Sequence, residues 1–143
     1  MKAIYTSETD IQRVGEGLVS CSLPKAEWTH AAHFAAALWL MRAGYDVPRA
    51  MPGLIRAYNE AVGRVNDDHG GFHETITQAS LRAARGVLDA NAPDVPVWRI
   101  VNTMMASNLA NPNWLLEYWS RERLMSVEAR RQWLEPDLKP LPF

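Results

Sequence analysis

Residues 28–41 constrain the fold more than any other part of the sequence. They read WTHAAHFAAALWLM, which is apolar on nearly every side of a helix and contains neither glycine nor proline. A helix that is hydrophobic all round is stable only when it is buried, so the rest of the chain has to surround it. The stretch falls short of the roughly 18 apolar residues that a membrane-spanning helix needs. We therefore expect a central buried helix here and no membrane partner.

Capping and turn residues divide the remaining sequence into further helical segments. No alternation with a period of two residues, which would indicate a strand, stands out. We predict an all-α fold, an irregular bundle of five or six helices, as a single domain over residues 1–143 with an extended proline-rich tail from about 135 to 143. The expected helices cover about 7–21, 28–43, 48–65, 73–90, 95–109 and 114–125, with a last turn or two after Ser126.

Composition excludes several classes of protein. The chain has 143 residues, of which 48% are hydrophobic and 22% charged, as in an ordinary globular domain. The net charge of -1 gives no excess positive field, so no nucleic-acid partner is expected. Cys21 is the single cysteine, which rules out an intramolecular disulfide. The first ten residues lack the apolar core of a signal peptide, so we expect a cytoplasmic protein.

Three of the four histidines fall on helix faces that should point inward. His30 and His33 lie one turn apart on one apolar face, and His73 lies on the apolar face of the helix expected from about residue 73. A buried imidazole is costly unless it has a partner. We therefore expect the three rings to converge on one interior point, with Glu74 beside them and His69 in the preceding glycine-containing loop.

Three hypotheses account for such a cluster. In the first, His30, His33 and His73 bind one divalent metal such as Zn, Ni or Fe, and Glu74 is a base or fourth ligand of an enzyme acting on a small polar molecule. In the second, no metal is bound, and these side chains line a pocket for a small-molecule ligand. In the third, each histidine bonds a nearby carbonyl or hydroxyl in a structural protein, expected to be a homodimer. Whether the protein is an enzyme stays open.

The segment WLLEYWSRERL adds one more candidate residue. On a continuous helix, Trp114, Tyr118 and Arg121 would share one stripe. Arg121 would then orient an anionic group of the substrate at a pocket wall. The alternative is a set of ordinary core aromatics, with Arg121 paired to a neighbouring carboxylate such as Glu117.

Four motifs in combination resemble a family of short uncharacterised bacterial helical proteins. They are WTHAAH, AYNEAVG, GGFHETIT, and YWSRERL followed by WLEPDLKPLP, and the resemblance covers about residues 23–140. It implies no substrate, and His69 has no counterpart in it. A looser analogy to DinB-type helical metalloproteins, which bind metal through three histidines, rests on architecture and ligand type alone. The resemblance implies that motif positions of the family are occupied by His30, His33, His73, Glu74 and Arg121.

Overall fold

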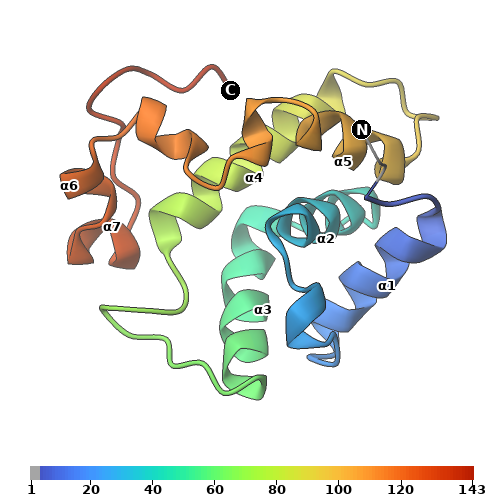
Figure 1. Cartoon of the computed structure of the whole chain (residues 1–143), viewed down its shortest axis with the longest axis horizontal. Helices are drawn as coiled ribbons and strands as arrows, with labels where there is room; N and C mark the ends of the chain where they lie inside the picture. The colour runs from blue at the N-terminus through green and yellow to red at the C-terminus, as the bar shows by residue number, and fades with distance from the viewer. Residues whose placement is uncertain (1–3) are drawn as a thin grey trace.

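The structure, a computed structural model, describes residues 4–143 and is all-helical over that range, as the sequence predicts (Figure 1). Three short 3-10 helices separate some of the α-helices: η1 (Lys25–Glu27), η2 (Asn108–Ala110) and η3 (Trp114–Glu117). The α-helices are α1 (Glu8–Val19), α2 (His30–Arg42), α3 (Val47–Ala61), α4 (Glu74–Asp89), α5 (Val97–Met105), α6 (Arg121–Leu124) and α7 (Val127–Arg131).

Helix α2 is the centre of the fold. Thr29 begins it, because the Thr29 hydroxyl accepts a hydrogen bond from the Ala32 amide at 3.2 Å. Most of its side chains are buried, and α1, α3, α4 and α5 all pack against it. Figure 1 shows α1 and α3 against α2, with α6 and α7 at one end of the molecule beyond α4. The expectation of a buried helix surrounded by the rest of the chain is confirmed.

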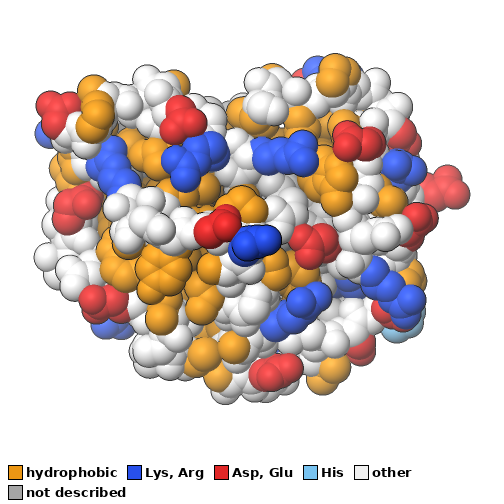
Figure 2. All heavy atoms as spheres, turned by 180° about the vertical axis from the view of Figure 1, so that it is seen from behind, with side chains coloured by type: hydrophobic (Ala, Val, Ile, Leu, Met, Phe, Trp, Pro, Cys, Tyr) orange, Lys and Arg blue, Asp and Glu red, His pale blue; other side chains and the backbone are white. Residues whose placement is uncertain are grey.

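The surface shows no segregation of charge on the face opposite to that of Figure 1. Basic and acidic side chains are interspersed there, with hydrophobic patches between them (Figure 2). None of the helices within residues 4–143 has the length and hydropathy of a membrane-spanning helix.

The segment 114–125 does not form one helix, which corrects the sequence prediction. The 3-10 helix η3 ends at Glu117, and Ser120 begins α6 by accepting a hydrogen bond from the Arg123 amide. Asp137 of the tail holds this break, since its carboxylate accepts hydrogen bonds from the Ser120 amide and hydroxyl, each at 2.7 Å. As a result Arg121 is exposed, and it shares no stripe with the buried Trp114.

The proline-rich tail contains no helix, and it packs onto the fold rather than merely lying on the surface. The Trp119 indole donates a hydrogen bond to the Leu134 carbonyl at 2.9 Å, and the Leu138 amide donates to the Tyr118 carbonyl at 2.8 Å. At the end of the tail, Phe143 packs edge-on against an aromatic ring of η3.

Helices α1 and α2 approach closely because Gly15 has no side chain. A Cβ at Gly15 would overlap the indole of Trp39 on α2. Replacing Gly15 with alanine therefore forces the two helices apart. We expect Gly15→Ala to lower the free energy of unfolding by about 1–3 kcal/mol, measured by urea denaturation followed by circular dichroism.

Gly53→Ala is the matched control for this prediction. Gly53 lies inside α3, and a Cβ there meets no atom within 4 Å. Since alanine has the higher helix propensity, Gly53→Ala should raise the free energy of unfolding by about 0.5–1 kcal/mol. If Gly15→Ala proves as stable as Gly53→Ala, the close contact of α1 with Trp39 does not exist.

Candidate functional site

Each of the three histidines expected to point inward is hydrogen-bonded to a different backbone carbonyl. A carbonyl only accepts, so the ring nitrogen donates in each case. Among residues 4–143 no three His, Cys, Asp or Glu side chains are placed to share a metal ion, so this arrangement does not form the expected three-histidine metal site. The pairs are His30 Nε2 with Leu109 O (2.7 Å), His33 Nδ1 with Thr29 O (2.7 Å) and His73 Nε2 with Leu124 O (2.8 Å).

His73 precedes α4 instead of lying on its inward face. Its backbone is extended, and its Nδ1 accepts a hydrogen bond from the Ile76 amide at 3.1 Å, so the imidazole caps the helix. Both ring nitrogens are therefore engaged. Burial lowers the pKa of His73, and the nearby Arg130 acts in the same direction. The side chain is buried and neutral, and it links α4 to the end of α6.

The remaining predicted site residues lie apart from the histidines. Glu74 is half-buried in the first turn of α4, where the helix dipole favours a carboxylate. His69 and Arg121 are both exposed. None of these three side chains lines the cavity next to His30 and His33.

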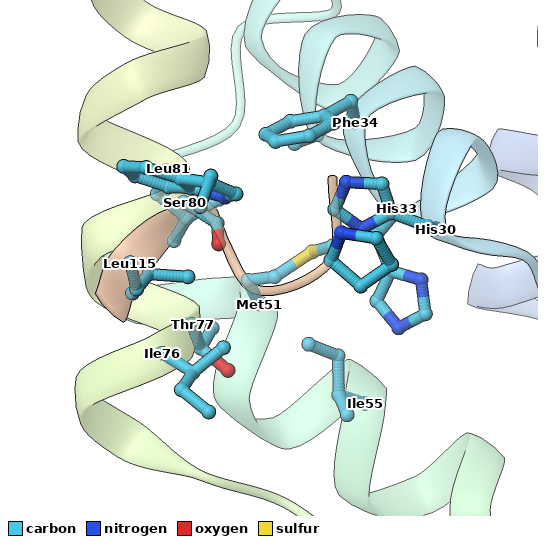
Figure 3. A pocket seen from close by; sticks show the side chains of 13 residues that line it. His30, His33, Phe34, Met51, Ile55, Ile76, Thr77, Ser80, Leu81 and Leu115 are labelled. Atoms are coloured by element: carbon cyan, nitrogen blue, oxygen red, sulfur yellow. The ribbon is translucent and has the colours of Figure 1, made fainter. Parts of the chain in front are cut away.

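That cavity, called here the neutral cavity, lies between α2, α3, α4 and η3 and has a volume of about 310 Å³. This is at the small end of the roughly 300–1,000 Å³ typical of ligand sites. In Figure 3, His30 and His33 lie on the α2 side, across from Thr77, Ser80 and Leu81 of α4. No Asp, Glu, Lys or Arg lines it. The lining residues are His30, His33, Phe34, Ala37, Met51, Ile55, Ile76, Thr77, Ser80, Leu81, Pro112, Trp114 and Leu115.

Several polar groups of this lining have no partner. Trp114 is only 4% exposed, and its indole N–H makes no hydrogen bond within residues 4–143. An unsatisfied buried donor costs about 1–3 kcal/mol. In the same part of the chain, no hydrogen bond satisfies the hydroxyls of Thr77 and Ser80, or the second ring nitrogens of His30 and His33. The lining residues thus combine apolar side chains with a buried indole donor and several further polar groups that lack partners within residues 4–143.

His33 is held as a neutral hydrogen-bond acceptor. Its ring stacks on Trp28 with 3.9 Å between ring centroids and 30° between planes. Burial lowers the pKa of His33 to about 4, although the hydrogen bond to the Thr29 carbonyl acts in the opposite direction. His30 and then Arg64 lower this pKa further. Because Nδ1 carries the proton donated to Thr29, Nε2 keeps its lone pair at neutral pH.

Sequence reasoning identified part of this site. The inward direction of His30 and His33 follows from helix periodicity, and both side chains line the neutral cavity. The sequence pattern did not predict that Met51 and Ile55, which are four residues apart on α3, form another wall of this cavity. That spacing predicts only that the two side chains share a face, not what they face.

No protein-family model matches the sequence, and no curated protein or solved structure matches it either. The resemblance to a bacterial family therefore stays a prediction.

The pKa of His33 makes stability depend on pH. The imidazole binds a proton near pH 6.5 in an unfolded chain and at about 4 in the folded one. Between these values the unfolded state carries more protons, so the free energy of unfolding falls as pH drops from 6.5 to 4, by about 1 kcal/mol per pH unit. His73, whose pKa is also lowered, adds to the same trend.

Urea denaturation of the wild type and of His33→Gln between pH 7 and pH 4.5 measures this contribution. Glutamine does not titrate. As the pH falls, the free energy of unfolding of the variant should therefore decrease by about 1 kcal/mol per pH unit less than that of the wild type. Parallel pH profiles for the two proteins would show that His33 is not held neutral by the fold.

Proposed function

We propose that this chain is a small-molecule binding protein whose ligand occupies the neutral cavity. The observation that carries the proposal is a largely apolar space of about 310 Å³ whose lining includes Trp114, a residue whose buried indole N–H has no hydrogen-bond partner within residues 4–143. A ligand whose hydrogen-bond acceptor reaches this N–H satisfies a buried donor, and leaving such a donor unsatisfied costs about 1–3 kcal/mol. Burial of the ligand's apolar part adds roughly 25 cal/mol for each Å² removed from water.

The lining defines what such a ligand looks like. A cavity of about 310 Å³ without charged side chains suits a small, largely apolar molecule. The ligand accepts from Trp114 and donates to the free Nε2 of His33, and hydroxyls on α4 add weaker orientation. The part of the ligand inside the neutral cavity is therefore uncharged and largely apolar, and any donor or acceptor on it is oriented by these groups.

The metal-dependent enzyme has less support. His73 uses one ring nitrogen for the Leu124 carbonyl and the other for the Ile76 amide. A third ligand for a metal at His30 and His33 would need to come from a rearranged chain. The ligand-binding proposal requires no rearrangement of these hydrogen bonds.

The Trp114 indole signal tests the proposal directly. The chain has six tryptophans, so NMR of the ¹⁵N-labelled protein records six indole cross peaks, and the peak lost in Trp114→Phe belongs to Trp114. Four neutral probes are titrated: benzyl alcohol, phenol, acetophenone and cyclohexanone. We expect a saturable downfield shift of the Trp114 indole proton with at least one of them, because a new acceptor reaches the N–H.

Two leucine variants provide the matched control. Ala37→Leu fills the neutral cavity and should weaken binding by about tenfold or more, whereas Ala57→Leu on the exposed side of α3 should leave it unchanged. Circular dichroism confirms that both variants fold. If none of the four probes moves the Trp114 signal, or if Ala37→Leu binds as well as Ala57→Leu, the proposed function is wrong.

A further inference from the structure

A second hollow adjoins the neutral cavity. We call it the basic hollow; its volume is about 250 Å³, and it shares four lining residues with the neutral cavity: His33, Ile55, Ile76 and Thr77. The two spaces are therefore neighbours, and the side chains of these four residues lie between them. The residues that line only the basic hollow are Trp28, Asn59, Arg64, Gly71, Phe72, His73, Met125 and Arg130.

The basic hollow differs from the neutral cavity in its charge. Arg64 and Arg130 are its charged lining residues, and no Asp or Glu lines it. Within residues 4–143 the Arg64 side chain makes no hydrogen bond or ion pair, which leaves its guanidinium available. Asp68 is already paired with Arg131 through contacts of 2.8 and 2.6 Å. These hydrogen bonds are the main cause that lowers the pKa of Asp68, and the nearby Arg130 acts in the same direction.

Arg130 is fixed in place by the loop that precedes α4. Its Nη1 donates to the carbonyls of Gly71 and Phe72 at 3.2 and 3.3 Å. Gly71 has φ +77°, and a Cβ there would lie 2.5 Å from the Val65 carbonyl oxygen, so only glycine fits this turn. The remaining N–H groups of Arg130 are therefore held in position without side-chain partners.

Both guanidiniums act electrostatically on the histidines beside the hollow. Arg64 contributes to the lowered pKa of His33, and Arg130 contributes to that of His73. The junction of the two cavities thus has two guanidinium groups close to an apolar space, and Glu74 acts on His73 in the opposite direction. An anion in the hollow would pair with these two guanidinium groups.

We propose that the ligand is an organic anion with an apolar body, and that Arg64 and Arg130 bind its carboxylate in the basic hollow while the body passes His33 into the neutral cavity. This rests on the proposed function and narrows its ligand class to alkyl- or arylcarboxylates. Guanidinium groups bind carboxylates through charge-assisted hydrogen bonds, which are stronger than neutral ones.

A pair of matched probes tests the proposal: 4-phenylbutyrate and its neutral amide, 4-phenylbutyramide. Isothermal titration calorimetry at pH 7 and low salt gives the ratio of their affinities. In the wild type the carboxylate should bind about tenfold or more tightly than the amide. In Arg64→Gln/Arg130→Gln the ratio should fall to about one, because carboxylate binding weakens and amide binding does not.

The double variant Arg49→Gln/Arg85→Gln is the charge-matched control. Both arginines are exposed and lie outside the two cavities, so the affinity ratio should stay at its wild-type value. Arg64→Gln alone removes a side chain that makes no hydrogen bond or ion pair within residues 4–143, so it should lower the ratio without affecting folding. This keeps the test valid if the loss of Arg130 disturbs the loop.

The outcomes separate this inference from the proposed function. If the wild type binds the two probes with equal affinity, and Ala37→Leu binds neither of them, the anion site is wrong. The neutral cavity then remains as a ligand site. An equal fall of the ratio in both arginine pairs shows a general charge effect and also overturns the anion site. If neither probe binds, the carboxylate proposal fails, whereas the four neutral probes decide the proposed function independently.

Discussion

The burial of α2 on all sides is the constraint on which the rest of the structure depends. A helix with so few polar residues needs cover from several directions, and α1, α3, α4 and α5 supply it. The closest cover comes from α1, where Gly15 admits the ring of Trp39. Helices α3 and α4 also pack against α2, and the space left between these helices and η3 is the neutral cavity. The neutral cavity thus results from the way in which the other helices pack around the uniformly apolar helix α2.

Local signals in the sequence were enough to predict most of the helices. Ser7 and Ser126 begin α1 and α7 as expected, each by accepting a hydrogen bond from an amide three residues ahead. The break at Ser120 was not predictable in the same way. It depends on Asp137, which lies 17 residues further along the chain. Helix periodicity treats 114–125 as continuous because it contains no information about this distant carboxylate.

The candidate site was predictable only in part, for a related reason. Periodicity places His30 and His33 on an inward face, but the partners that fix their rings follow from the fold. Leu109, whose carbonyl holds His30, is 79 residues away in sequence, and Leu124 is 51 residues from His73. Each buried imidazole is satisfied by a hydrogen bond to its own carbonyl, so the three rings do not have to meet at one interior point. The unpartnered N–H of Trp114 and the charge of Arg64 at the junction are visible only in three dimensions.

The packing of Phe143 on Trp114 couples the end of the tail to the cavity wall. The two rings meet edge to face with 6.1 Å between their centroids, and Trp114 lines the neutral cavity. The same phenylalanine also contacts the position that a Cβ on Gly86 would occupy, at 3.3 Å. A fluorophore or spin label attached at residue 143 would therefore lie against the wall that encloses the cavity. Position 143 offers a site from which occupancy can be read optically or magnetically without altering any residue of the lining.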